Sequence, residues 1–223
     1  MMDLTGIGLY TLTQASRLSG AKATEVSRWL FGYKTNGGKK IPPLWQSQVQ
    51  EPDEKVIGFR DLLELRFIKA FVNHGVPVQV IRAALTSAKE IFKTDYPFTS
   101  HRFLTDGRSI FYETLNQEEH ELTDLARRQL VFESIIRPQL YRGIEFSAQG
   151  TAIRWYPGKA KTVVLDPEIS FGRPILSAFG IPTEIIAQAM KAEQNIKAVA
   201  AQFEIPVAQA RAAVRFEEQL LAA

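Results

Sequence analysis

The sequence contains no cysteine, which excludes disulfide bonds, thiolate metal sites and cysteine nucleophiles. Histidine is scarce, because only His74, His101 and His120 occur, and their spacing matches no metal-ligand pattern. No run of about eighteen apolar residues is present, and the chain does not begin with the basic-then-apolar pattern of a secretory signal. These absences predict a cytoplasmic chain with no metal site, no cofactor and no association with a membrane.

Signatures of catalysis are missing as well. No glycine-rich phosphate loop follows a strand-like segment, and no paired histidine ligands occur. Acidic pairs such as Glu118-Glu119 and Glu217-Glu218 fall on expected helix surfaces, where solvation is their ordinary role. The sequence therefore indicates that the protein is not an enzyme.

The positive charge of the chain is concentrated at its beginning. With 223 residues, 45% of them hydrophobic, the chain can bury a full core and form two compact domains. Its net charge is only +3, but the first fifty residues hold six basic side chains and two acidic ones. The whole basic excess thus lies in one segment, as expected if that segment approaches phosphate groups.

Residues 10–30 have the pattern of two short helices joined by a tight turn. The inward positions of both helices are apolar, and Gly20 suits a left-handed turn between them. The outer side of the second helix would carry Lys22, Thr24, Glu25, Ser27 and Arg28. This layout is that of a helix-turn-helix, in which a polar second helix reads the major groove. We therefore predict DNA contacts by Lys22, Thr24, Ser27 and Arg28; an ordinary helical hairpin is the alternative.

Residues 33–58 are polar and rich in turn-forming residues. Asn36-Gly37-Gly38 marks a tight turn, and Pro42-Pro43 stiffens the segment that follows. A hairpin "wing" with Lys34, Lys39 and Lys40 facing the DNA backbone would have this composition, and so would a disordered loop. We favour the wing because the apolar residues around Trp45 need a surface to pack on.

Two further helices are expected, one over 61–71 and one that begins at Pro77. The order of Tyr10-Thr11-Leu12, Arg28-Trp29, Phe59-Arg60-Asp61-Leu62 and Gly75-Val76 resembles the winged helix-turn-helix of MerR-type regulators. The resemblance covers about residues 8–92. It implies that the third and fourth helices brace the reading helix and the wing.

The middle of the chain has a different character. Residues 96–115 predict a β-hairpin around Asp106-Gly107, and 118–139 predict one long helix. The resemblance to MerR-type regulators implies that this helix pairs two subunits; the alternative is that it packs on its own domain. Residues 141–165 predict a small sheet, with a loop and hinge at Pro157-Gly158-Lys159.

The last sixty residues predict an extended arm over 169–175, then a helix capped by Thr183, then a second helix-turn-helix over 195–221. Gln209, Arg211 and Arg215 form a second candidate DNA-binding surface on the last helix. Because residues 183–223 hold four basic and five acidic side chains, a structural or partner-binding role for this unit is at least as well supported.

The order of Leu165-Asp166-Pro167, Gly172-Arg173-Pro174-Ile175, Gly180-Ile181-Pro182-Thr183 and Val199 to Ile205 resembles a small bacterial domain family of unknown function found beside PIN-type nuclease toxins. Together with the MerR-like front, the chain resembles the larger antitoxins of the VapB class. The resemblance implies a carboxylate-rich nuclease as partner, into which Phe171 and Arg173 would insert. The alternative is that Arg173 pairs with Asp166 or Glu168 inside its own domain.

We therefore predict a mainly α protein with small β elements, in which a MerR-like winged helix-turn-helix precedes a homeodomain-like three-helix domain. The expected boundaries are 1–95 for DNA binding, 96–160 for dimerisation and 161–223 for the antitoxin-type domain. The expected function is that of a dimeric antitoxin that binds operator DNA and a PIN-type ribonuclease toxin. A MerR-like regulator that responds to a small molecule, and a protein–protein adaptor, are the alternatives.

Overall fold

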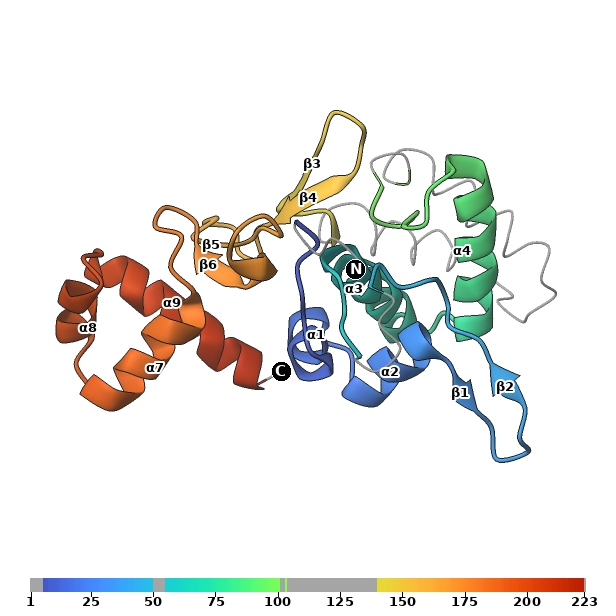
Figure 1. The fold of residues 1–223 in the computed structure, drawn as a ribbon, viewed down its shortest axis with the longest axis horizontal. Helices are drawn as coiled ribbons and strands as arrows, with labels where there is room; N and C mark the ends of the chain where they lie inside the picture. Colours follow the sequence, from blue (N-terminus) through green and yellow to red (C-terminus); the bar gives the residue numbers. More distant parts are fainter. Residues whose placement is uncertain (1–5, 50–54, 101–102, 104–139, 223) are drawn as a thin grey trace. The chain divides into compact units, whose positions relative to one another are not determined.

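The computed structural model describes residues 6–49, 55–100, 103 and 140–222, and the chain divides into two compact units. The N-terminal unit comprises Thr11–Tyr141 and Phe146–Ala152, and the C-terminal unit comprises Met1–Tyr10, Arg142–Glu145 and Ile153–Ala223. The described ranges contain seven α-helices and two small sheets (Figure 1), which confirms a mainly α chain with small β elements. None of the helices in these ranges is long and apolar enough to cross a membrane.

The N-terminal unit begins with two short helices, α1 (Leu12–Ser19) and α2 (Ala23–Phe31). Thr11 starts α1 with a capping box, because its hydroxyl accepts from the Gln14 amide at 3.2 Å while its own amide donates to the Gln14 side chain at 2.9 Å. Gly20 ends α1 in the left-handed conformation, with φ 72°. The buried side chains are those expected from the helical spacing: Ala15, Leu18, Val26, Trp29 and Leu30. The two predicted helices and their glycine turn are confirmed.

A two-stranded hairpin, β1 (Tyr33–Lys34) and β2 (Lys40–Ile41), follows α2, and then come the longer helices α3 (Phe59–Asn73) and α4 (Val78–Phe92). Helix α3 is buried on most of its surface. Its Phe71 ring lies 5.2 Å from Phe98, which lies 4.8 Å from Phe103. Both helices occur where the sequence predicts them, and this aromatic cluster forms the centre of the unit's core.

Asp61, in the first turn of α3, is a fully buried carboxylate with four different donors. It accepts from Trp45 Nε1 at 2.8 Å, Ser47 Oγ at 2.9 Å, and the amides of Gln48 and Gly58, each at 3.0 Å. Burial raises the pKa of Asp61 above its ordinary value, while these donors favour its charged form. Asp61 thereby fixes the segment that follows the hairpin onto α3.

Glu64, one turn further along α3, is a second buried acid with a weaker set of donors. One of its oxygens accepts from the Thr99 amide at 3.2 Å and from the Thr99 hydroxyl at 3.3 Å. Its other oxygen, Oε2, has no hydrogen-bond partner within the described ranges. Burial raises the pKa of Glu64 to about 8. The side chain is therefore largely protonated at neutral pH.

We expect Glu64 to make the N-terminal unit less stable as the pH rises. The folded protein binds the Glu64 proton up to about pH 8, whereas the unfolded chain releases it near the ordinary glutamate pKa of 4.5. This contribution to the free energy of unfolding is therefore fully present below that value and is lost as the pH rises through 8, at about 1.4 kcal/mol per pKa unit. Glu64→Gln should weaken the dependence, and the exposed Glu90→Gln should leave it unchanged. Urea denaturation at pH 5 and pH 8.5 measures the free energy of unfolding of each variant. An equal change in this free energy between the two pH values for wild type and Glu64→Gln would contradict the assignment.

The larger sheet has the strand order β3 (Ile144–Phe146), β4 (Ala152–Trp155), β5 (Val163–Leu165) and β6 (Pro174–Leu176). Strand β5 pairs antiparallel with β4 and with β6, and Val164 lies opposite Ile175. The predicted small sheet over 141–165 is confirmed, with β6 as an additional strand. The predicted turn at Asp106-Gly107 and the predicted helix over 118–139 lie outside the described residues.

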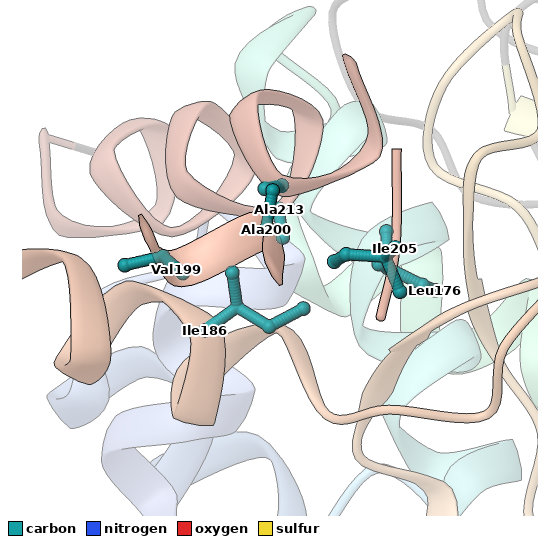
Figure 2. Packing of buried hydrophobic residues seen from close by; sticks show 7 residues of the cluster. Leu176, Ile186, Val199, Ala200, Ile205 and Ala213 are labelled. Atoms are coloured by element: carbon teal, nitrogen blue, oxygen red, sulfur yellow. The ribbon is translucent and has the colours of Figure 1, made fainter. Parts of the chain in front are cut away.

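Three helices complete the C-terminal unit: α7 (Thr183–Glu193), α8 (Ile196–Gln202) and α9 (Val207–Ala222). Asn195 caps α8, because its side chain accepts from the amides of Lys197 and Ala198. Figure 2 shows the apolar cluster between the helices and β6, made of Leu176, Ile186, Val199, Ala200, Ile205, Ala210 and Ala213. This cluster fixes the angle between α8 and α9.

Two local predictions in this unit were wrong. The expected extended arm is instead a turn over Ser170–Gly172, labelled η2, and only Pro174–Leu176 is strand. Thr183 does not cap α7, since Pro182 holds the cap position and Thr183 is the first helical residue. The Thr183 hydroxyl is buried and bonds to the Pro174 carbonyl and to the Glu217 carboxylate. The Thr183 hydroxyl, expected to cap the helix, thus makes tertiary hydrogen bonds instead.

Candidate nucleic-acid interface and partner-binding loop

Helix α2 has one buried and one polar face. Lys22 lies at its N-cap, and Lys22, Thr24 and Arg28 are exposed, while Ser27 is half-buried. Because residues three and four apart share a face, these four side chains lie opposite the buried stripe. The structure thus brings together the four residues predicted on α2.

Glu25, expected on the outer side of α2, is half-buried and bound to a neighbouring helix. Its carboxylate accepts from the Lys22 amide at 2.7 Å and pairs with Lys69 of α3 at 2.9 Å. Although burial alone would raise the pKa of Glu25, the Lys22 amide and the Lys69 ammonium hold it below its ordinary value. Glu25 therefore caps α2 and ties it to α3, and no sequence pattern reveals a partner 44 residues away.

The hairpin after α2 presents the three predicted lysines. Lys34 and Lys40 are register partners across β1 and β2, and both are exposed together with Lys39 in the turn. The turn is closed by backbone hydrogen bonds between Thr35 and both Gly38 and Lys39, each 2.9 Å long. A hairpin is thus present where the sequence predicts a wing or a loop.

The base of the hairpin is fastened to both neighbouring helices. Arg82 of α4 donates to the carbonyl of Pro43 at 2.6 Å and to that of Pro42 at 2.8 Å. The Leu44 amide donates to the Trp29 carbonyl of α2 at 2.7 Å. The hairpin of β1 and β2 is consequently held in a defined position next to α2 (Figure 1).

Tyr33 and Lys55 also belong to this surface, and the sequence did not predict them. Tyr33 is 43% exposed, and the Arg28 guanidinium lies 5.3 Å from the centre of its ring. The Lys55 ammonium donates to Ser27 Oγ at 3.2 Å and lies 5.5 Å from the Phe31 ring centre. An aromatic residue next to a candidate wing strand was the available signal for Tyr33, whereas Lys55 reaches α2 only through the fold.

Four basic side chains of this surface form no ion pair with a carboxylate of the described residues. None of the ion pairs between described residues involves Arg28, Lys34, Lys39 or Lys40. Together with Lys22 and Lys55 they give α2 and the hairpin an exposed positive face. Such a face attracts phosphate groups.

A second conspicuous surface lies on the turn Ser170–Gly172 of the C-terminal unit. Its three residues all have positive φ, at 49°, 55° and 77°, which is strained for Ser170 and Phe171 because they carry a Cβ atom. Phe171 is 64% exposed and Arg173 is exposed beside it. The two predicted partner-binding residues therefore lie together on a surface turn.

The N-terminal segment of the same unit holds this turn in place. The Leu9 amide donates to the Phe171 carbonyl at 2.9 Å, and the Tyr10 hydroxyl donates to the Gly172 carbonyl at 2.6 Å. A Cβ on Gly172 would lie 2.5 Å from the Tyr10 oxygen, so only glycine fits. Burial raises the pKa of Tyr10 far above its ordinary value, which keeps this hydroxyl a donor.

The alternative pairing of Arg173 with Asp166 is not observed. Arg154 binds Asp166 at 2.5 Å, and the other Asp166 oxygen accepts from the Glu168 amide at 3.0 Å. Within the ranges that the structure describes, no ion pair involves Arg173. Its guanidinium is thus available to a partner.

The second candidate DNA-binding surface is less polar than the sequence suggests. Arg211 and Arg215 are exposed on one face of α9, and Gln209 is half-buried. The two arginines border a hollow of about 250 Å³, whose other lining residues are Met190, Ile196 and Val214. No group of three or more His, Cys, Asp or Glu side chains suited to a metal ion occurs among the residues covered by the structure.

Known proteins resemble this chain over nearly its whole length. A curated relative from Mycobacterium tuberculosis (strain ATCC 25618 / H37Rv), named "Putative antitoxin VapB45", is 26% identical over 93% of this chain and 93% of its own. Residues 163–216 match the family model "Protein of unknown function (DUF433)". A solved structure described as Rv2018 from Mycobacterium tuberculosis covers 94% of this chain and 98% of its own, with a TM-score of 0.71 and 21% identity. The last similarity shows that the fold is shared.

Proposed function

We propose that this chain is a non-enzymatic antitoxin of a type II toxin–antitoxin system. It binds operator DNA of its own operon and holds a PIN-type ribonuclease toxin inactive. The observation that carries the proposal is the similarity, over 93% of both chains, to the protein named "Putative antitoxin VapB45". The match of residues 163–216 to the DUF433 model agrees with the resemblance noted for the last sixty residues.

In this proposal the N-terminal unit acts as a MerR-like winged helix-turn-helix. Helix α2 enters the major groove with Lys22, Thr24, Ser27 and Arg28, while Lys34, Lys39 and Lys40 contact phosphates. This arrangement is supported by the exposure of the basic side chains. It is also supported by the two hydrogen bonds from Arg82 that hold the base of the hairpin. Tyr33 and Lys55 extend the same surface.

Operator recognition of this kind requires a dimer. One reading helix contacts only a few base pairs, so two half-sites on a two-fold axis supply the specificity. We assign dimerisation to the segment 96–160, between a DNA-binding segment 1–95 and an antitoxin segment 161–223. The operator would then be a palindrome.

The toxin contact is assigned to the turn that presents Phe171 and Arg173. PIN-type nucleases hold divalent metal with clustered carboxylates, and such carboxylates gain strongly from a fixed cation in place of the metal. Arg173 supplies a planar, permanently charged group, and Phe171 supplies an apolar anchor. Their exposure on a braced turn supports this assignment.

For Gln209, Arg211 and Arg215 we favour contact with a protein over contact with DNA. The hollow between the two arginines is lined by apolar side chains, and Gln209 is half-buried. Residues 183–223 also hold four basic and five acidic side chains, so the unit carries no positive field.

Two classes of contact in the DNA complex should respond differently to mutation. Arg28→Ala should weaken operator binding by about 1–3 kcal/mol if Arg28 pairs with a guanine, and it should affect unrelated DNA less. Lys39→Gln or Lys40→Gln should weaken binding to all DNA sequences equally. Each should also reduce the slope of log K against log salt by about one. Gel-shift titrations at several salt concentrations with the region upstream of the operon measure both effects.

Lys159→Gln is the matched control, since Lys159 is an exposed lysine of the C-terminal unit. Its binding curve should coincide with that of the wild type. Unchanged operator affinity in a variant that combines Arg28→Ala, Lys34→Gln, Lys39→Gln and Lys40→Gln would refute the assignment of the DNA-binding surface.

A further inference from the structure

A polar hollow of about 230 Å³ lies in the N-terminal unit, away from α2 and the hairpin lysines. Its walls are the first turn of α3, the C-terminal end of α4, the loop after α4, and the tip of the β3–β4 hairpin. An isolated β-bridge joins Ser100 of the loop to Thr151 of the hairpin tip. Thr151 is itself fixed by a 2.8 Å hydrogen bond from the Ser147 amide. The hollow is thus formed by segments that hydrogen bonds hold together.

The charged residues that line the hollow are both cations, Arg60 and Lys93. The other polar lining residues are uncharged: Thr94, Tyr96, Thr99, Ser100, Gln149 and Thr151. The Thr99 and Ser100 hydroxyls donate to Glu64 and to the Pro97 carbonyl, so Gln149 and Thr151 remain as uncharged donors. No carboxylate lines the hollow as the described residues define it. Its lining therefore favours a negatively charged ligand that accepts hydrogen bonds.

The nearby carboxyl groups are engaged elsewhere. Asp61 accepts from four donors on the segments around residues 45–58, and Asp95 pairs with Lys89 at 2.5 Å. Glu64 accepts from Thr99, and because burial raises its pKa to about 8 it carries little charge at neutral pH. The positive charge of Arg60 and Lys93 is therefore not cancelled by a neighbouring ion pair.

Arg60 is positioned before any ligand arrives. Its backbone amide donates to Gln48 Oε1 at 3.2 Å, and its guanidinium lies 5.8 Å from the centre of the buried Tyr96 ring. No hydrogen bond or ion pair joins that guanidinium to another residue in the described part of the chain. A stacked guanidinium with free N–H groups matches the oxygens of a phosphate or carboxylate.

We propose that this hollow binds the phosphate or carboxylate group of a small molecule, with Arg60 and Lys93 as the charged ligands. The Thr151 hydroxyl lies in the same lining and is a further donor. The site lies outside the surfaces assigned to DNA and to the toxin, so the proposal does not depend on the antitoxin function.

Isothermal titration of the full-length protein with two probes, inorganic phosphate and succinate, tests the site at constant ionic strength. We expect at least one probe to bind with a Kd at or below about 1 mM. Binding of phosphate alone assigns the site to phosphorylated molecules, and binding of succinate alone assigns it to carboxylates. Absence of binding by both probes up to ten times that concentration would overturn the proposal.

Variants decide whether the observed binding occurs in this hollow. Lys93→Gln and Arg60→Gln should each lower the affinity for the probe about tenfold, which corresponds to about 1.4 kcal/mol. Lys191→Gln removes the same charge from an exposed position on α7 and should leave the affinity unchanged. Lys93 is exposed, so Lys93→Gln decides the question even if Arg60→Gln lowers the stability. Wild-type affinity in Lys93→Gln, or an equal loss in Lys191→Gln, would contradict the site.

Discussion

Asp61→Ala is expected to destabilise the N-terminal unit by at least about 3 kcal/mol, because each buried donor left without a partner costs about 1–3 kcal/mol. The substitution leaves the Trp45 indole N–H and the amides of Gln48 and Gly58 without their acceptor. It also removes the side chain that holds the segment after the hairpin onto α3. Urea denaturation followed by tryptophan fluorescence measures the loss.

Two other variants separate this network from a general effect of charge. Asp95→Ala removes an exposed carboxylate of the same unit, whose pair with Lys89 is worth about 0–1 kcal/mol. Asp61→Asn keeps one carbonyl acceptor, so its stability should lie between those of Asp61→Ala and the wild type. If Asp61→Ala unfolds within about 1 kcal/mol of Asp95→Ala, the network does not fix the segment.

The second large effect is expected in cells. Arg173→Ala should abolish protection against the proposed PIN-type toxin partner, while operator binding stays at the wild-type level. In the proposed function Arg173 supplies the cation for the carboxylates of the nuclease, and no ion pair of the described residues uses it. Growth after co-expression of toxin and antitoxin variant measures protection. Arg142→Ala, an exposed arginine of the same unit, is the control and should protect fully.

The turn that carries Phe171 allows the anchor and the backbone to be tested separately. Phe171→Asn removes the apolar ring and keeps a residue that tolerates the left-handed conformation at φ 55°. Gly172→Ala keeps Phe171 and Arg173 but places a Cβ 2.5 Å from the Tyr10 oxygen, which displaces the turn. Both variants should protect cells poorly against the toxin. Full protection by Arg173→Ala and Phe171→Asn would show that the turn has only a structural role.

The sequence predicts the helices well because their signals are local. The apolar spacing, the left-handed Gly20 and the hydrogen-bonding partners Thr11 and Gln14 all lie within a few residues of the ends they define. The same holds for Asn36-Gly37-Gly38, which marks the turn between β1 and β2. Local physics is sufficient for these elements.

The sequence fails where distant segments meet. Ser170 and Phe171 have positive φ because Leu9 and Tyr10 hold the turn, so a locally extended pattern becomes a turn. Lys69 is paired with Glu25 from 44 residues away, and no spacing rule reaches that far.

The hollow in the N-terminal unit could not be predicted from the sequence for the same reason. It joins Arg60, Lys93 and Thr151, which lie far apart in the sequence. The charge count of the first fifty residues identifies a basic segment, but only the fold shows which cations meet in one place.

RNA cleavage is the direct readout of the proposed inhibition of the toxin. The proposed partner, a purified PIN-type nuclease, is assayed on RNA with increasing amounts of the purified chain, in a buffer that contains its divalent metal. We expect the wild-type chain to suppress cleavage at stoichiometric amounts and Arg173→Ala to leave cleavage undiminished. Undiminished cleavage in the presence of excess folded wild-type chain would contradict the proposed inhibition.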